Sequence, residues 1–146
     1  MQLLLVEDED MAARKLAKTL FSVEPTATVV AITGSIQETV DWLRTYGSAH
    51  VRSPDLILMD LELADGQSVQ IFDQIQVTTP VIFTTSYDEY ALRAFRASGV
   101  DYLLKPVQKE ELQAAILKFI RQRALGQSTA GQTSDALRQL VQALHG

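Results

Sequence analysis

A small set of charged and hydroxyl side chains follows short apolar runs of this chain, and these residue types suit phosphate and metal chemistry. They are Glu7 and Asp8 after LLLV, Asp60 after LILM, Thr85 after VIFT, and Lys105 after YLL. Carboxylate oxygens are the ligands that Mg²⁺ prefers, and a carboxylate can also attack phosphorus as a nucleophile. An ammonium or hydroxyl group beside them could bind phosphoryl oxygens. The set therefore predicts a site that binds a divalent cation and holds a phosphoryl group on a carboxylate.

The apolar runs themselves indicate how these residues could meet. The runs are apolar throughout rather than alternating, which is typical of strands covered on both faces. Segments of helical length and period lie between them, so strands and helices alternate along the chain. This order predicts a parallel sheet with right-handed crossovers and helices on both sides. The carboxyl ends of parallel strands share one edge, where ligands of open α/β sheets bind.

The expected elements cover most of the chain, with boundaries uncertain by a few residues. Strands are expected at about 2–6, 27–32, 55–59, 80–84 and 101–104. Helices are expected at about 10–22, 35–47, 66–75, 87–98 and 108–124.

Composition favours one folded domain over residues 1–125. The 146 residues are 47% hydrophobic, which is enough to bury one core. The absence of cysteine excludes disulfides and thiolate metal sites. A net charge of -5 argues against a nucleic-acid surface within this chain. A core strand directly after Met1 and no apolar stretch of about 20 residues lead us to expect a cytoplasmic protein with no membrane contact.

Residues 126–146 differ in composition from the rest of the chain. The run GQSTAGQT is polar and flexible, as in a linker. Beyond it, Ser134 could cap a short helix with an apolar face made of Leu137, Leu140, Val141 and Leu144. Such a helix is marginal alone, so it could fold back or fray, self-associate, or be the start of something longer.

The same residues, in their order and spacing, resemble the receiver domains of bacterial two-component response regulators over about residues 1–125. The resemblance rests on Glu7-Asp8, Asp60 followed by Gly66, Thr85 in PVIFTTS, and Tyr102 with Lys105-Pro106 in DYLLKPV. The run PVIFTTSYDEYALRAF, continuing to VDYLLKPV, is most similar to receivers attached to LytTR-type DNA-binding domains. The implied fold is doubly wound and flavodoxin-like, with a five-stranded parallel sheet of order 2-1-3-4-5 and five helices.

The resemblance implies a role for each site residue. Asp60 would be the phosphoacceptor, and the Mg²⁺ ligands would be Asp8, Asp60, the backbone carbonyl of Glu62 and, through water, Glu7. Lys105 would pair with Asp60 and then with a phosphoryl oxygen, and the Lys105-Pro106 peptide bond would be cis.

Two further residues would form the switch that the resemblance implies. Thr85 would donate its hydroxyl to the phosphoryl group, with Thr84 as the competitor for this role, and Tyr102 would change rotamer to fill the vacated space. Both could instead be ordinary packed strand residues.

The resemblance also implies partners and an output. A sensor histidine kinase would supply the phosphoryl group, and the chain would be a phosphoacceptor that assists its own phosphorylation and dephosphorylation rather than an enzyme. The face of segments 87–98, 101–104 and 108–124 would change on phosphorylation and control transcription through a LytTR-type domain absent from this chain. Charges of both signs on that face favour a phosphorylation-dependent homodimer.

Each residue also has a plainer interpretation, and other functions compete. Asp60 alone could be a turn or capping aspartate, Lys105 a loop lysine, and the acids at 7–10 a solvated run opening a helix. A phosphohydrolase of the haloacid-dehalogenase type also uses an aspartyl phosphate, but its Asp-x-Asp loop after the first strand is missing. A receiver that is never phosphorylated and acts as an interaction module is the main alternative, and a flavodoxin-like cofactor carrier is disfavoured by the acids at the functional edge.

Overall fold

The computed structural model describes residues 1–47, 53–86 and 101–126. Its strands are β1 (Gln2–Val6), β2 (Thr28–Thr33), β3 (Leu56–Asp60), β4 (Glu62–Leu63), β5 (Gly66–Gln67), β6 (Val81–Thr85) and β7 (Tyr102–Leu104). Its helices are α1 (Asp10–Val23), α2 (Ile36–Trp42), α3 (Ile71–Gln74) and α5 (Lys109–Ala124). A π-helical turn, Leu43–Gly47, extends α2, and a 3₁₀ turn, Ser68–Gln70, precedes α3.

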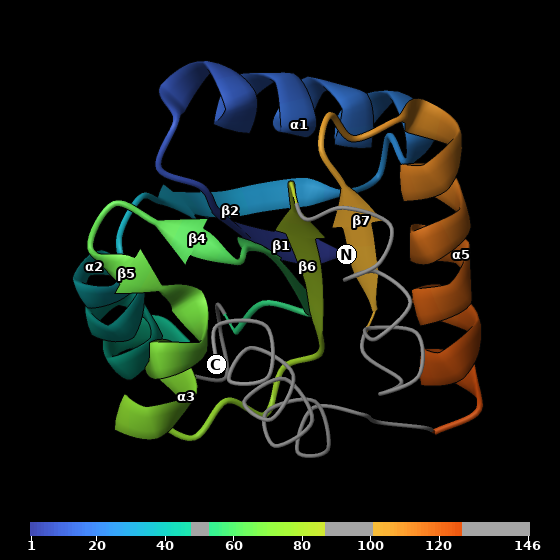
Figure 1. Cartoon of the computed structure of the whole chain (residues 1–146). Coiled ribbons are helices and arrows are strands. Elements are labelled where there is room, and N and C mark those ends of the chain that lie inside the picture. Colours follow the sequence, from blue (N-terminus) through green and yellow to red (C-terminus); the bar gives the residue numbers. More distant parts are fainter. Residues whose placement is uncertain (48–52, 87–100, 127–146) are drawn as a thin grey trace.

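Five of these strands form one sheet in the order β2-β1-β3-β6-β7 (Figure 1). Every neighbouring pair in this sheet is parallel. Because β6 and β7 are its fourth and fifth strands in sequence, the predicted order 2-1-3-4-5 is confirmed. The carboxyl ends of all five strands therefore lie along one edge.

One face of the sheet packs against α1 and α5, which contact each other (Figure 1). Leu3 and Leu5 of β1 point to this side, together with Leu56 and Leu58 of β3. The helices contribute the buried side chains Leu20, Leu112, Ile116 and Phe119. These helical residues recur at the spacing of one apolar stripe, which explains why α1 and α5 lie along the sheet.

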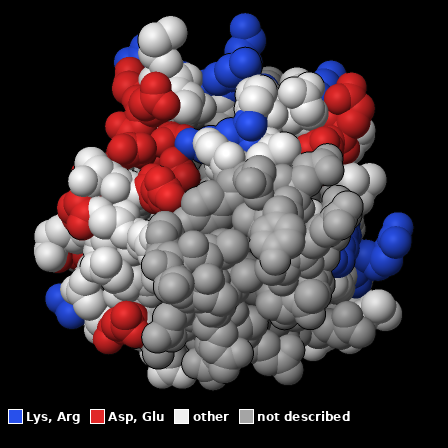
Figure 2. Space-filling model, viewed as in Figure 1, with Lys and Arg blue, Asp and Glu red and all other residues white. Residues whose placement is uncertain are grey.

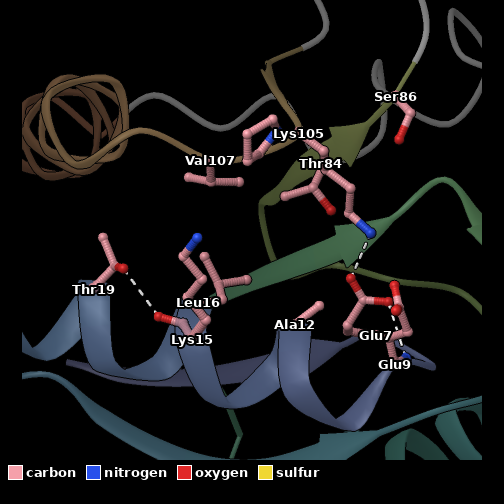
Figure 3. Close-up of a pocket in the computed structure, with 11 residues that line it drawn as sticks. Glu7, Glu9, Ala12, Lys15, Leu16, Thr19, Thr84, Ser86, Lys105 and Val107 are labelled. Carbon is pink, nitrogen blue, oxygen red and sulfur yellow. Dashed lines mark hydrogen bonds and ion pairs between the residues drawn. The ribbon is translucent and has the colours of Figure 1, made fainter.

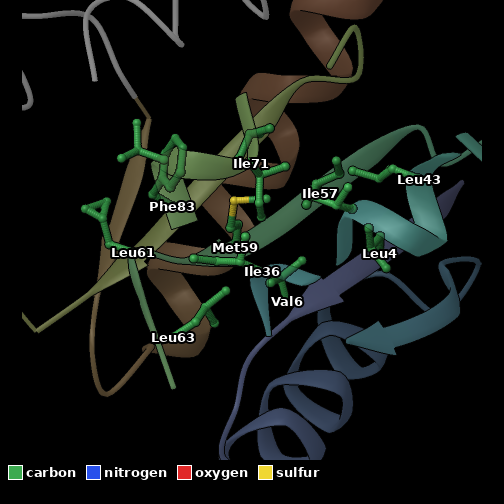
Figure 4. Close-up of a cluster of buried hydrophobic side chains, with 13 residues drawn as sticks. Leu4, Val6, Ile36, Leu43, Ile57, Met59, Leu61, Leu63, Ile71 and Phe83 are labelled. Carbon is green, nitrogen blue, oxygen red and sulfur yellow. The ribbon is translucent and has the colours of Figure 1, made fainter. Parts of the chain in front are cut away.

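The opposite face packs against α2 and α3 (Figure 4). Leu4 and Val6 point to this side because successive side chains of a strand alternate between faces. The cluster is completed by Ile36, Val40, Leu43, Ile57, Met59, Leu61, Leu63, Val69, Ile71, Val81 and Phe83. With both faces covered, the central strands need the continuous apolar runs seen in the sequence.

The prediction of a helix at 66–75 is wrong over its first part. Residues 66–67 form β5, which pairs antiparallel with β4, and the α-helical part is only Ile71–Gln74. Gly66 has a φ of 136°, a conformation that glycine adopts readily and other residues avoid. The turn between the two strands consists of Ala64 and Asp65, and the hairpin displaces the start of the helix.

Some expectations lie outside the described residues. They are the helix at 87–98 and the linker and terminal helix at 126–146, of which only residue 126 is described. Within the described ranges, no helix combines the length and apolar character needed to cross a membrane.

Candidate functional site

Carboxylates from two neighbouring strands meet at the carboxyl edge of the sheet. Glu7 and Asp8 directly follow β1, and Asp60 is the last residue of β3, the strand that pairs with β1. One carboxylate oxygen from each of the three residues lies within 4.8 Å of the others. Glu7 and Asp60 are buried while Asp8 is exposed, so the cluster is open to solvent on one side. These hard oxygen donors fit Mg²⁺ in chemical type.

Lys105 extends into this acidic cluster from the end of β7 (Figure 3). Its Nζ donates to Oε1 of Glu7 at 2.5 Å and to Oδ2 of Asp60 at 2.6 Å. The pair with Asp60 was expected from the sequence. The pair with Glu7 was not, because the sequence assigned Glu7 only a water-mediated metal contact.

The charges in the cluster are unbalanced. Three carboxylates and one ammonium leave a formal charge of two negative units. Loss of water raises the pKa of the Asp8 carboxyl, and its hydrogen bond and repulsion with Glu7 raise it further. Burial alone would lower the pKa of Lys105, but hydrogen bonds and attraction from Asp60 and Glu7 outweigh burial and raise it. The cluster is therefore suited to take up a cation.

Thr85 ends β6 beside these residues and is buried. Its carbonyl oxygen accepts a hydrogen bond from the backbone N–H of Lys105 at 2.7 Å. Thr84, its competitor in the sequence interpretation, is also buried. Because neighbouring strand residues face opposite sides, the two hydroxyls differ in surroundings. Thr84 lines the cavity beside α1 that Figure 3 shows.

The remaining predicted residues surround this core of the site. Tyr102 is half-buried at the start of β7 and packs against the cluster on the α2 and α3 side. Glu62 has an exposed side chain, and its backbone N–H donates to Oδ1 of Asp60 at 3.2 Å. The Lys105-Pro106 peptide bond is cis.

A cavity of about 410 Å³ borders the site (Figure 3). Glu7 and Lys105 form part of its wall, and residues of α1, including Lys15 and Leu16, form the opposite wall. The cavity gives solvent and small solutes access to the Lys105 side of the carboxylate cluster.

The surface around the site is acidic. Figure 2 shows Asp and Glu side chains gathered over the start of α1 and the β4–β5 hairpin. The exposed acids of these segments are Asp8, Glu9, Asp10, Glu62 and Asp65. Their combined field attracts divalent cations toward this edge of the sheet.

Asp65 is a residue of this region that the sequence reasoning missed. Its carboxylate accepts from the backbone N–H groups of Ile36 at 2.8 Å and Gln37 at 3.2 Å, across the gap between the hairpin and α2. An aspartate followed by glycine is common in turns, and this composition could have indicated an interruption of the predicted helix. No local pattern predicts its contact with a helix nearly thirty residues earlier.

Comparison with known proteins gives the class of this fold and site. The profile of the response regulator receiver domain matches residues 3–117, so the chain belongs to this family of phosphoacceptor domains. Receiver domains work with histidine kinases in two-component signalling, and an acidic cluster like this one is typical of their Mg²⁺ site.

Individual relatives agree with this assignment. The sensory transduction protein LytT of Enterococcus faecalis is 30% identical over 138 residues, which cover 92% of this chain and 53% of LytT. The transcriptional regulatory protein BtsR of Salmonella typhi is 26% identical over 125 residues, covering 84% of this chain and 49% of BtsR. The chain thus spans about half the length of these curated relatives.

A solved structure gives the same result for the fold. The signal receiver domain of a modulated diguanylate cyclase from Desulfovibrio desulfuricans superposes with a TM-score of 0.66 at 25% identity. The match covers 86% of this chain and 98% of that domain.

Proposed function

We propose that this chain accepts a phosphoryl group from a sensor histidine kinase on Asp60 and thereby switches an output. The observation that carries the proposal is the pairing of the Asp60 carboxylate with Lys105 at 2.6 Å, within a cluster that also contains Glu7 and Asp8. A nucleophilic carboxylate, a cation beside it and further hard oxygens are what phosphoryl transfer to an aspartate requires.

In the proposed transfer, one oxygen of the Asp60 carboxylate attacks the phosphorus of a phosphohistidine. A P–O bond forms as the P–N bond breaks, and the imidazole leaves with the electron pair and takes up a proton. Mg²⁺ held by Asp8, Asp60, the Glu62 carbonyl and, through water, Glu7 would neutralise charge on the incoming group. Lys105 would exchange its hydrogen bond with Asp60 for one with a phosphoryl oxygen.

The proposed switch uses Thr85 and Tyr102. The Thr85 hydroxyl would donate to the phosphoryl group and draw the end of β6 toward Asp60, and the Tyr102 ring would fill the space left. A phosphoryl group adds nearly two negative charges, and it shifts the population only if the active arrangement binds those charges better.

The proposed output is control of transcription through a LytTR-type DNA-binding domain outside this chain. The support is the similarity to LytT and BtsR, which are named as sensory transduction and transcriptional regulatory proteins and are about twice as long as the matched segment. We place the change of surface on the face that contains β7 and α5.

A homodimer through this face is part of the proposal. The described charges of the face are of both signs, and Lys118 pairs with Asp101 within the chain at 2.8 Å. Phosphorylation would make such pairs exchange between two identical faces. Sedimentation at high concentration measures this directly, and equal coefficients with and without phosphorylation would rule the dimer out.

The test of the central proposal is an intact-mass measurement. Wild type, Asp60→Asn and Glu62→Gln are incubated with acetyl phosphate, with Mg²⁺ or with a chelator. We expect an alkali-labile phosphoryl adduct in wild type and Glu62→Gln only when Mg²⁺ is present, because the Glu62 side chain has no role in the proposal.

We expect no adduct in Asp60→Asn, whose side chain has nearly the same shape but is a poor nucleophile. An adduct that persists in Asp60→Asn would mean that another residue is the acceptor. A folded wild type without any adduct would favour the phosphorylation-independent interaction module.

A further inference from the structure

The Asp65 carboxylate joins the β4–β5 hairpin to the start of α2 by two hydrogen bonds. The first N–H groups of a helix have no partner within the helix. In α2 the first two, from Ile36 and Gln37, donate to the Asp65 carboxylate at 2.8 and 3.2 Å. The third, from Glu38, donates to the hydroxyl of Ser35 at 3.0 Å. Asp65 and Ser35 thus share the capping of one helix, and of these two capping residues Asp65 is the one that lies on another segment.

The hairpin that carries Asp65 is continuous with the phosphoacceptor strand. Leu61 and Glu62 follow Asp60 directly, and the Glu62 N–H donates to the Asp60 carboxylate at 3.2 Å. The carbonyl of Leu61 accepts from the N–H of Ser68 at 2.9 Å, which closes the base of the hairpin, and the Leu61 N–H donates to the carbonyl of Thr84 at 3.0 Å, which joins that base to β6. The Glu62 backbone therefore lies between two attachments of the hairpin, the sheet at its base and the Asp65 contact at its turn.

The residues that lead into α2 lie against the segment that carries Glu7 and Asp8. The Glu7 N–H donates to the carbonyl of Thr33 at 2.9 Å, just before the helix. Gly34 lies close enough that a Cβ there would be 3.6 Å from the Cα of Asp8. The stretch from Thr33 to Gln37, which enters α2, is consequently in contact with both segments that carry proposed metal ligands.

We propose that Asp65 is a positioning residue of the metal site, which sets the Glu62 backbone relative to Glu7 and Asp8 by binding the first two amides of α2. This inference rests on the proposed function of the site. In this role Asp65 does not need to touch the metal, because it acts through the hydrogen bonds that its two oxygens accept from the amides of Ile36 and Gln37. Mg²⁺ tolerates little departure from octahedral geometry, so freedom of one ligand segment weakens binding even when every ligand is present.

The contact is well suited to this task. A carboxylate at a helix N-terminus is stabilised by the partial positive charge there. The hydrogen bond from Ile36, and after it the one from Gln37, hold the pKa of Asp65 below its ordinary value. The carboxylate thus stays charged and bound throughout the neutral range. Gly66, with its φ of 136°, lets the chain turn so that the hairpin approaches Ile36 closely.

The test is the affinity for Mg²⁺ measured by titration calorimetry in the absence of any phosphodonor. In Asp65→Ala we expect the Kd for Mg²⁺ to rise about tenfold, the lower end of the range for residues that support metal ligands indirectly. Ser35→Ala removes the other cap of the same helix and leaves the hairpin attached, and Glu38→Gln removes a carboxylate from the same helix end. We expect both control variants to stay within about twofold of wild type, whereas Asp65→Asn, which keeps an oxygen for Ile36, falls between wild type and Asp65→Ala.

The controls separate positioning from plainer effects. Equal weakening in Asp65→Ala and Glu38→Gln would show that only charge was lost, and equal weakening in Ser35→Ala would show that only the helix was loosened. Either result overturns the inference. If Asp65→Ala does not fold, the Mg²⁺ affinity of Asp65→Asn is compared with those of the two control variants instead. Wild type that binds no Mg²⁺ would refute the proposed site altogether, whereas normal binding by wild type and by every variant would refute only the role of Asp65.

Discussion

Replacing Lys105 by methionine should destabilise the protein when a chelator is present, and Mg²⁺ should reduce that loss. Methionine keeps most of the side-chain volume and removes only the charge. The Lys105 side chain is 23% exposed, while its partners Glu7 and Asp60 are 4% and 9% exposed. Removing one member of a buried ion pair costs about 3–5 kcal/mol, because the other charge stays buried without a partner.

The expected magnitude follows from that exposure. Because nearly a quarter of Lys105 is in contact with water, we expect about 3 kcal/mol, the lower end of this range, or a fall in Tm on the order of 10 °C. Without the ammonium, the formal charge of the cluster changes from two to three negative units. If this lowers the Kd for Mg²⁺ tenfold, Mg²⁺ at the same high concentration stabilises the folded variant by about 1.4 kcal/mol more than it stabilises wild type.

The assay is urea unfolding of both proteins in chelator and in saturating Mg²⁺, with Lys118→Met as a matched control. Lys118 also forms an ion pair, with Asp101, but the two side chains are 57% and 32% exposed. Its loss should cost less than about 1 kcal/mol and should not depend on Mg²⁺. Equal losses in Lys105→Met and Lys118→Met, or a loss in Lys105→Met that Mg²⁺ does not reduce, would refute the reasoning.

Two further outcomes test the fold around the site. Asp65→Asn should lower the free energy of unfolding by up to about 1 kcal/mol near neutral pH. The pKa of Asp65 is lower in the folded state than its ordinary value of 3.8. Its contribution to the free energy of unfolding is therefore complete above 3.8 and is lost as the pH falls through the folded-state pKa. Urea unfolding from neutral to acidic pH should therefore show that the free energies of unfolding of wild type and variant converge below pH 3.8. A difference that stays constant with pH would contradict the capping of α2 by the Asp65 carboxylate. Leu58→Ala should cost about 2–5 kcal/mol, because Leu58 is 1% exposed between β3 and the helices. Leu117→Ala, at an exposed position of α5, should change stability by less than about 0.5 kcal/mol, and similar losses in the two variants would contradict the assignment of the core.

The sequence predicted the sheet well because the signal for it is repeated in every strand. Runs such as LILM, which precedes Asp60, are apolar on both faces, and their alternation with helical segments leaves few topologies. Convergence of Asp60 and Lys105 followed from the topology, since parallel strands end at the same edge.

The details that the sequence did not predict have two causes, one local and one long-range. The helix expected from residue 66 begins later because a two-residue turn and the backbone conformation of Gly66 favour a hairpin. The pairing of Lys105 with Glu7 and the capping of α2 by Asp65 join residues far apart in sequence. Periodicity and local motifs carry no information about such pairs, because their geometry is set only when the elements pack.

The hydrogen bond from the Lys105 N–H to the Thr85 carbonyl gives the site a mechanical property. It joins the backbone of the residue that supplies the ammonium to the backbone of the residue that carries the buried hydroxyl, at 2.7 Å. A shift of the end of β6 must therefore carry the start of the Lys105 segment with it or break this bond. While this bond holds, the backbones of Thr85 and Lys105 move together, so that a displacement at the end of β6 also shifts the residue whose ammonium pairs with Asp60.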